Sequence, residues 1–301
     1  MDIDKILAEF AKDDLIYWFV PIFLLAVVLE YFYGRARNLD LHQKDDTIAS
    51  FWMMFYVVIA DIIPKLVGFA LIFYLHEISP LKDVIGRQWW AWGLLFLLDD
   101  LTYYWFHRLN HQVRIMWAGH VNHHSAVRMH YATALRQGVG ERFHKYFFWV
   151  PLALLGFDAL MIFTMMSINL FYQFWTHTET VRRLPRPIEW LFNSPSHHRV
   201  HHASNIRYLD TNHAGVLIVW DRLFGSYAEE LDAEPPVYGL TENLASQRPV
   251  NVLTHEYRAI LHDVKRAPRW QDKLRYIFWS PGWSHDGPDK RAKVLRAQES
   301  L

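Results

Sequence analysis

Apolar residues dominate three long stretches in the first third of the chain. Residues 15–33 are almost wholly apolar and have about the length that a helix needs to cross a bilayer. Residues 49–75 form a second stretch, in which Pro64 predicts a kink. Residues 88–106 form the third. This pattern predicts membrane-spanning helices that are joined by short polar loops.

A fourth apolar stretch covers residues 143–175 and has Pro151 and Gly156 near its middle. We expect a helical hairpin that enters the membrane and returns to the same face. Farther along, residues 250–265 and 269–279 alternate with a helical period between apolar and charged positions. The second of these is rich in Trp and Tyr and is expected to lie on the membrane surface.

The loop of residues 34–48 indicates the orientation of the chain. It carries Arg35, Arg37 and Lys44, and the positive-inside rule therefore places it in the cytoplasm. Counted from this loop, the third apolar stretch and the hairpin both end on the cytoplasmic side. The pattern predicts about four to five crossings, with the polar residues 125–142 on the cytoplasmic face.

Composition narrows the possible chemistry. Lys and Arg number 31 and Asp and Glu also number 31, so nothing favours nucleic acid as a partner. The chain has no cysteine, which excludes thiolate metal sites and thiol catalysis. It has 18 histidines, thirteen of them between His107 and His213. Aromatic residues make up 16% of the chain, as is typical of membrane-interface belts.

The histidines recur at the spacing of ligands on a helix. His107 and His111 stand one turn apart, and an H-x-x-H-H pattern occurs at 120–124 and again at 198–202. Ser194 and Pro195 predict the start of the last helix. Because one zinc ion takes three or four ligands, this number of imidazoles suggests two metal ions, and iron, copper, nickel and zinc all stay open. The predicted ligands are His107, His111, His120, His123, His124, His198, His201 and His202, with His177 as a ninth.

Other polar residues near these motifs are candidates for supporting roles. Asp100 precedes His107 by seven residues, and it is predicted to orient a ligand imidazole or, alternatively, to pack between helices. Arg136, Gln137 and Arg199 are candidates for holding a polar lipid head group. Structural roles are expected for the three histidines outside the motifs, which are His130, His144 and His213.

The three motifs together resemble those of the fatty acid hydroxylase / sterol desaturase superfamily of membrane di-iron enzymes. Within it, the surrounding sequence most resembles the alkylglycerol monooxygenase branch and its bacterial relatives. The resemblance covers roughly residues 40–230. The matching segments are residues 100–111, 133–137, 172–178, 193–202 and 220–225.

The resemblance implies an all-α integral membrane protein in which a cytosolic helical cap holds a dimetal site. We expect one domain over residues 1–301, with membrane helices mainly in 1–178, the cap in 179–228 and an interfacial tail in 229–301. The resemblance assigns the metal-ligand role to the eight histidines and adds His177. It also singles out Gln173, which stands where related hydroxylases have a further histidine.

The implied function is oxygen-dependent hydroxylation of a C–H bond in a membrane lipid, with an alkylglycerol ether lipid as the first substrate. The implied cofactors are two iron ions, which zinc can replace during purification, and oxygen. Electrons are expected from a separate cytochrome b5-like, ferredoxin-like or pterin donor. Gln112 stands where the alkylglycerol branch has an acidic residue, so pterin dependence does not follow. The resemblance to bacterial members implies a bacterial inner membrane.

Three other interpretations stay open. A sterol or fatty-acyl desaturase of the same superfamily would use the same metal site. A non-catalytic membrane metal-binding protein, such as a zinc scaffold or a transporter, would also use histidines, although transport favours ionisable groups spread through the spans. A soluble helical bundle is the third interpretation, and the apolar stretch 15–33 argues against it. His197 is an additional histidine that is expected to support the site rather than to bind metal.

Overall fold

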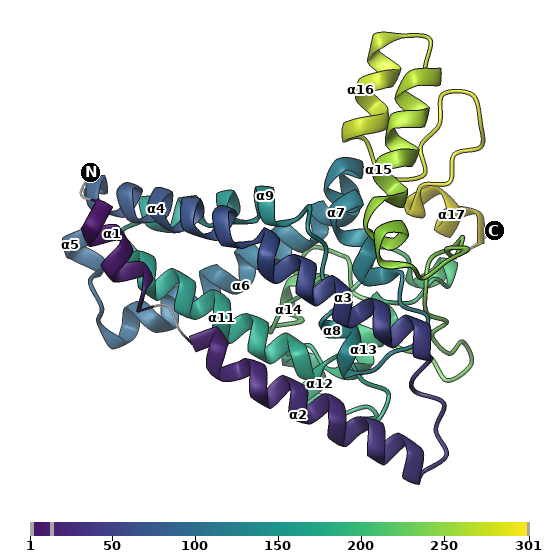
Figure 1. Ribbon diagram of the computed structural model, residues 1–301, viewed down its shortest axis with the longest axis horizontal. Helices are drawn as coiled ribbons and strands as arrows, with labels where there is room; N and C mark the ends of the chain where they lie inside the picture. The colour runs from purple at the N-terminus through teal and green to yellow at the C-terminus, as the bar shows by residue number, and fades with distance from the viewer. Residues whose placement is uncertain (1–2, 13–14, 300–301) are drawn as a thin grey trace.

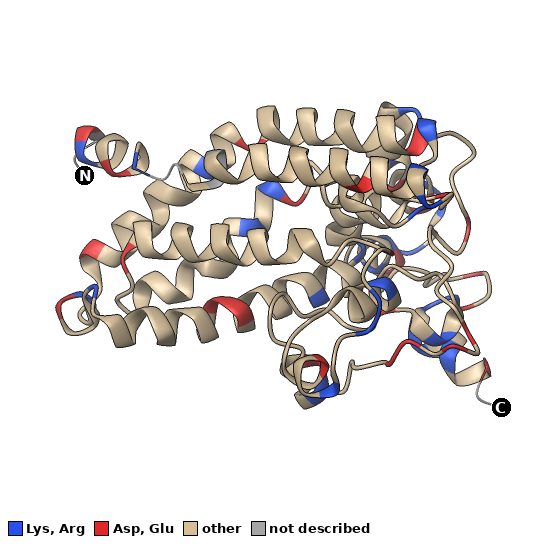
Figure 2. Ribbon diagram, turned by 90° about the horizontal axis from the view of Figure 1, so that it is seen from below, with Lys and Arg blue, Asp and Glu red and all other residues tan. Residues whose placement is uncertain are grey.

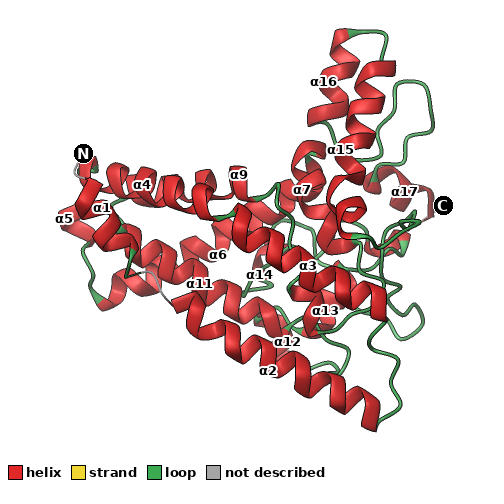
Figure 3. Ribbon diagram, in the orientation of Figure 1, coloured by secondary structure: helices red, strands yellow, loops and turns green. Residues whose placement is uncertain are grey.

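The computed structural model describes residues 3–12 and 15–299, and within them the regular structure is helical (Figure 3). The predicted all-α class is therefore confirmed. The longest helices of the first two thirds of the chain extend along one direction, and most of the shorter elements gather at the end away from the N-terminus (Figure 1). These long helices are α2 (Leu15–Ala36), α3 (Lys44–Ala60), α4 (Ile62–Ile78), α6 (Trp89–Gln112) and α11 (Ala159–Trp175).

The remaining elements build the two ends of the molecule and the tail. The two amphipathic patterns form helices α15 and α16, which pack together as an arm that projects from the body (Figure 1). Their predicted place on a membrane surface stays a prediction. These elements are α1 (Ile3–Phe10), α5 (Lys82–Ile85), α7 (Arg114–His124), α8 (Tyr131–Ala134), α9 (Arg142–Lys145), η1 (Tyr146–Trp149), α10 (Val150–Leu154), α12 (Arg186–Leu191), α13 (Pro195–His201), η2 (Ile206–Tyr208), α14 (Val219–Leu223), α15 (Pro249–Arg266), α16 (Trp270–Phe278) and α17 (Ala292–Glu299).

The kink predicted from Pro64 is present, one turn before the proline. Helices α3 and α4 meet at Asp61 with a bend of 48°. Pro64 has no N–H to donate to the carbonyl of Ala60, and its ring would clash with that carbonyl in a continuous helix. The chain therefore breaks at Asp61, and Pro64 lies in the first turn of α4, where proline is tolerated.

The predicted hairpin of residues 143–175 is also present, with unequal limbs. Its first limb consists of the short elements α9, η1 and α10, and its second limb is α11. Gly156 forms the turn with a φ of +95°, and a Cβ there would lie 2.6 Å from the carbonyl of Leu81. Asp158 then caps α11 by accepting from the backbone N–H groups of Leu160 and Met161.

Length and apolar composition identify fewer spans than the predicted four to five crossings. Within the described residues, α2 is long and apolar enough to cross a membrane, and α3 with α4 would count as a second, bent span. Helix α11 is apolar but has 17 residues. Figure 2 shows the long helices mostly free of charged residues, which lie at both ends of the bundle and most densely at the end that carries the C-terminus. The number of crossings stays a prediction.

The core of the bundle lies between α4, α6, η1, α10 and α11. Large buried side chains such as Phe69, Leu95 and Ile162 fill it. Asp99 lies within this apolar core, and it accepts hydrogen bonds from the indole of Trp149 at 2.7 Å and the amide of Asn169 at 2.9 Å. The buried carboxylate is therefore satisfied, and it ties α6 to η1 and α11.

Candidate metal centre

The histidines of the three motifs converge at the end of α6, where the bundle meets the short elements. They form two groups, and every member is buried. Within each group, the histidines each offer one ring nitrogen, and these nitrogens all lie within 4.8 Å of one another. Group one consists of His107, His111, His120, His124 and His201. Group two consists of His123, His177, His198 and His202.

Each motif is placed by a local feature of its helix. His107 and His111 lie on the last turns of α6, and His120, His123 and His124 lie on α7. The chain turns between the two helices at Val113, whose backbone is extended. The predicted start of α13 is correct, because the Ser194 hydroxyl accepts from the backbone N–H of His197. Helix α7 contributes His124 to group one and His123 to group two, and α13 contributes His201 to group one and His198 to group two. These two helices therefore connect the two groups.

In group one, hydrogen bonds fix which ring nitrogens carry protons. Nδ1 of His107 lies 2.8 Å from the carbonyl oxygen of His213, and Nδ1 of His120 contacts the carboxylate of Glu141. A carbonyl or carboxylate oxygen only accepts, so both Nδ1 atoms donate, and both Nε2 atoms of the neutral rings present lone pairs. Those two Nε2 atoms stand 3.0 Å apart. Two lone pairs at that distance repel each other, and a cation bound between them removes the repulsion.

Group two repeats the arrangement with backbone partners. Nδ1 of His123 lies 3.2 Å from the carbonyl oxygen of Arg136, and Nδ1 of His177 lies 2.9 Å from that of Gln173. The Nε2 atoms of these two histidines are 3.1 Å apart, and Nε2 of His198 lies 2.8 Å from that of His177. The residues of both groups therefore fit bound metal ions.

Electrostatics agrees with this assignment of protons. Burial, together with the neighbouring imidazoles, holds the pKa of His120 and His123 well below the ordinary value. Burial likewise lowers the pKa of His177 to about 4. The rings are therefore neutral near pH 7, and neutral imidazole is the form that binds a metal.

Glu141 is a functional candidate that sequence reasoning missed. It lies 21 positions after His120, and no motif marks it. Glycines bring it there, because a Cβ on Gly138 would lie 1.5 Å from the carbonyl oxygen of Gly119, and a Cβ on Gly119 would lie 2.8 Å from the backbone nitrogen of Glu141. A second carboxylate, that of Asp210, lies 3.4 Å from Nδ1 of His111.

Asp100 does not contact a ligand imidazole, contrary to the prediction. Its carboxylate accepts from the backbone N–H groups of Val216 at 2.7 Å and Leu217 at 2.9 Å, and from the indole of Trp220 at 2.9 Å. The residue is fully buried. Seven residues of helix place Asp100 two turns below His107, and at that depth it meets residues 214–220 instead of the histidines. It anchors this segment against α6.

Gln173 and Arg136 were predicted to act in the site, but their side chains point to structural partners. The Gln173 amide donates to Asn169 at 2.6 Å, and only its backbone carbonyl contacts His177. The Arg136 guanidinium is fully buried, with Asp46 at 3.0 Å and the Ser125 hydroxyl at 2.9 Å. A guanidinium that is already hydrogen-bonded inside the protein is not available to a lipid head group.

Two further head-group candidates are occupied in the same manner. Arg199 forms a two-pronged ion pair with Glu230 at 2.9 and 2.8 Å and also donates to two backbone carbonyls. The amide of Gln137 donates to the backbone of Ala134 at 2.9 Å. These side chains stabilise loops around the histidines.

Of three further histidines in this region, two have hydrogen-bonding partners away from the groups and one lies beside group one. His197 caps its own helix through Ser194 and approaches Glu189 at 3.4 Å, outside both groups. His144 contacts the Asn110 side chain at 2.8 Å. His213 is different, because its ring centroid lies 5.0 Å from that of His111 and, among the described residues, neither of its ring nitrogens has a hydrogen-bond partner. Sequence spacing gave no reason to place His213 beside group one.

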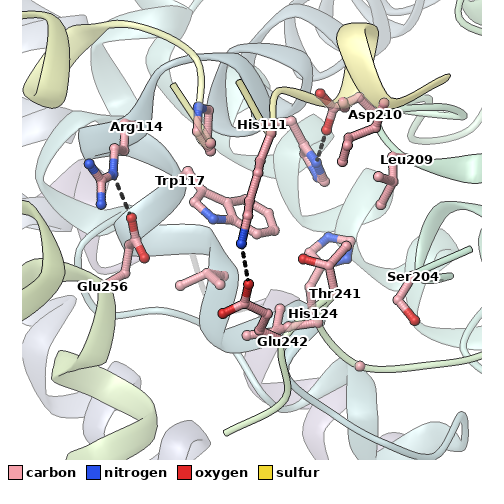
Figure 4. Close-up of a pocket in the computed structure, with 18 of the residues that line it drawn as sticks. His111, Arg114, Trp117, His124, Ser204, Leu209, Asp210, Thr241, Glu242 and Glu256 are labelled. Carbon is pink, nitrogen blue, oxygen red and sulfur yellow. Dashed lines mark hydrogen bonds and ion pairs between the residues drawn. The ribbon is translucent and has the colours of Figure 1, made fainter. Parts of the chain in front are cut away.

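A cavity of about 370 Å³ opens onto group one. His111, His124 and His201 line the cavity, together with residues of α7 such as Trp117, residues 203–210 and residues of the tail. Figure 4 shows His111 and His124 among these lining side chains. Ion pairs brace this wall, with Arg114 bound to Glu256 at 2.8 Å in the view. The cavity connects the histidines of group one to the side of the molecule that the tail covers.

Comparison with known proteins shows that the segment carrying these histidines is similar to a family of hydroxylases. The fatty acid hydroxylase family model matches residues 92–226, which include both histidine groups. An alkylglycerol monooxygenase of Xenopus tropicalis is 34% identical over 94% of this chain and 60% of its own length. The human alkylglycerol monooxygenase is 42% identical over 72% of this chain and 47% of its own length.

More distant relatives include an ornithine lipid hydroxylase of Rhizobium tropici, which is 27% identical over 50% of this chain and 45% of its own length. The chain thus spans about half the length of the curated relatives that it matches. No solved structure matches the chain.

Proposed function

We propose that the chain is an oxygen-dependent di-iron monooxygenase of a membrane lipid and a member of the fatty acid hydroxylase family, whose model matches residues 92–226. The proposed substrate is an alkylglycerol ether lipid, because relatives of 34% and 42% identity are alkylglycerol monooxygenases. Another bacterial lipid is the second candidate, because an ornithine lipid hydroxylase is also a relative.

The observation that carries the proposal is the pair of facing lone pairs in each histidine group. His107 with His120, and His123 with His177, present Nε2 atoms 3.0 and 3.1 Å apart, while each Nδ1 is held by an oxygen. Buried neutral rings whose lone pairs face each other are stabilised by a bound cation, and the two groups supply nitrogen donors for two metal ions. Two iron ions held there would supply the activation of oxygen, which side chains alone do not provide.

The residues of the chain have separate tasks in such a reaction. The Nδ1 partners hold each ring in one orientation, and the charge of Glu141 strengthens His120 as a donor. The cavity admits a reacting group to the side of His111, His124 and His201. Hydroxylation converts a C–H bond and one oxygen molecule into an alcohol and water, and it consumes two electrons and two protons, which a separate reductant must deliver.

Exposed apolar side chains support a membrane location for this substrate. On α2, Leu25 and Leu29 are about 60% exposed, and Val58 and Ile63 are similarly exposed beside the bend of α3 and α4. Apolar surface of this extent is covered by lipid or by a partner in a stable protein. We place the long helices in the membrane, with the histidine groups at its cytoplasmic side because of the basic loop after α2.

The test combines metal analysis with isotope labelling. The chain is expressed with iron, purified in detergent without an affinity tag, and analysed for iron and zinc. It is then incubated with alkylglycerol, ornithine lipid and sterol substrates, a reductant and ¹⁸O₂. We expect close to two irons per chain and one ¹⁸O atom in the product, because a monooxygenase transfers one atom of the molecule.

A matched pair of variants controls the assay. His198→Ala removes a histidine of group two, and His262→Ala removes an exposed one with no place in either group. Activity should disappear only in the first. Product without ¹⁸O, or about one tightly bound zinc with no product from any lipid, would refute the monooxygenase proposal and favour a metal-binding scaffold.

A further inference from the structure

Three side chains of metal-ligand type lie together outside the two histidine groups. Glu30 is on α2, His42 is in the loop of residues 37–43 that follows α2, and His130 directly precedes α8. Their donor atoms lie within 4.8 Å of one another, and the two ring centroids are 4.1 Å apart. We propose that Glu30, His42 and His130 bind a divalent transition-metal ion in a third metal site.

Within residues 3–12 and 15–299, the ring nitrogens of the two imidazoles have no hydrogen-bond partner. All four of these nitrogens are also shielded from solvent. His130 is fully buried, and burial lowers its pKa to about 3, so its ring is neutral. Buried polar atoms in folded proteins are nearly always satisfied, and four unsatisfied nitrogens on two adjacent rings therefore require an explanation. A metal ion bound by one nitrogen of each ring provides it.

Glu30 is a buried carboxylate whose negative charge has no basic side chain among the described residues to balance it. It is 4% exposed, and within residues 3–12 and 15–299 no lysine or arginine forms an ion pair with it. The backbone N–H of Tyr131 donates to its Oε2 at 2.6 Å, and the Thr178 hydroxyl donates to its Oε1. These bonds fix the carboxylate in one orientation while each oxygen keeps a lone pair. A divalent cation would supply the missing positive charge.

Two imidazoles and one carboxylate form a donor set that zinc and non-haem iron both accept. The set shares no residue with group one or group two, so the proposal does not rest on the proposed function. It does touch their surroundings, because Thr178, which holds Glu30, directly follows His177 of group two. A metal ion here would clip the loop of residues 37–43 to α2 and to the start of α8.

Metal counting tests the site directly. The full chain is purified without an affinity tag, stripped of metal and titrated with Co²⁺, with bound Co²⁺ read from visible absorption and from elemental analysis. We expect the wild type to bind one equivalent more than Glu30→Gln or His130→Asn. His262→Ala, which removes an exposed histidine, should bind as many equivalents as the wild type. Equal numbers in the wild type and in both site variants would overturn the proposal.

A second measurement applies if those buried substitutions prevent folding. His42 lies in a loop and is only partly buried, so His42→Ala removes a ligand without opening the core. Arg35, Arg37 and Lys44 flank this loop and are exposed to trypsin. Zn²⁺ should slow cleavage at these sites several-fold in the wild type and leave His42→Ala unaffected. Equal rates with and without Zn²⁺ in the wild type, or equal protection of both proteins, would count against the clip.

Discussion

The two histidine groups are built from the same motifs but are supported in different ways. In group one, carboxylates hold two of the rings, with Glu141 on His120 and Asp210 on His111, while backbone carbonyls hold His107 and His201. In group two, backbone carbonyls hold the rings of His123 and His177. The cavity makes a further difference, because it is lined by three histidines of group one and by none of group two.

This difference separates two tasks of a dimetal site. A carboxylate partner adds negative charge and raises the donor strength of an imidazole, whereas a carbonyl mainly fixes its orientation. Group one is therefore tuned by side chains and faces the cavity, and group two is fixed by the fold. Each prediction below changes one group and asks whether the other responds.

The largest effect is expected from removing a ligand. His201→Asn takes one imidazole from group one, and His198→Asn takes one from group two. Each variant should retain about one metal ion per chain and lose detectable activity, because both ions are needed for the proposed reaction. Elemental analysis with the lipid assay checks this. Loss of both ions from either single variant would show that the two groups bind as one unit and would break the comparison.

A large loss of stability is expected from Arg136→Leu. The substitution leaves Asp46 as a buried charge without its partner, at a cost of about 3–5 kcal/mol. It also leaves the backbone carbonyl that holds His123 less firmly positioned, so the metal affinity of group two should fall before that of group one. Thermal unfolding and metal content measure the two consequences.

Arg128→Leu provides the control for this prediction. Arg128 and Asp40 form an exposed pair, and its loss should cost less than about 1 kcal/mol. If Arg136→Leu instead left the melting temperature unchanged and raised only the KM for lipid, the head-group role predicted from the sequence would be correct after all.

A smaller effect is expected at Glu141. Replacing it with Gln keeps an acceptor for His120 but removes the charge, and metal affinity at group one should fall about 10–100-fold. Metal competition with a chelator of known affinity measures this. Glu256→Gln changes a carboxylate in the cavity wall that is paired with Arg114, and it should leave the affinity unchanged. Equal affinities in the Glu141 variant and the wild type would remove the proposed difference between the groups.

A feature could be predicted from the sequence when the residues that determine it lie close together in the chain, and could not when they lie far apart. Helix periodicity and capping are local, and they predicted α2, the start of α13 and the amphipathic helix α15. The spacing of the histidines likewise selected eight residues, and the family resemblance added His177; the fold brings all nine together. The partners of their Nδ1 atoms were not predictable, because Glu141 reaches His120 only through the close approach of Gly138 to Gly119. Asp100 failed for the same reason, since its partners lie more than a hundred residues away.

The smallest effect concerns access to the two groups. Trp117 lines the cavity, and its ring lies 5.1 Å from His111 and 5.5 Å from His124. A small chelator such as dipicolinate should remove one metal ion quickly, from group one, and the other slowly. Trp117→Ala should speed only the fast phase, by a few-fold, because it widens the approach to group one. Trp270→Ala removes an exposed indole on α16 that does not line the cavity, and both phases should keep their rates. A single phase in the wild type would mean that both ions are equally accessible, and the contrast between an open and a closed group would then have to be abandoned.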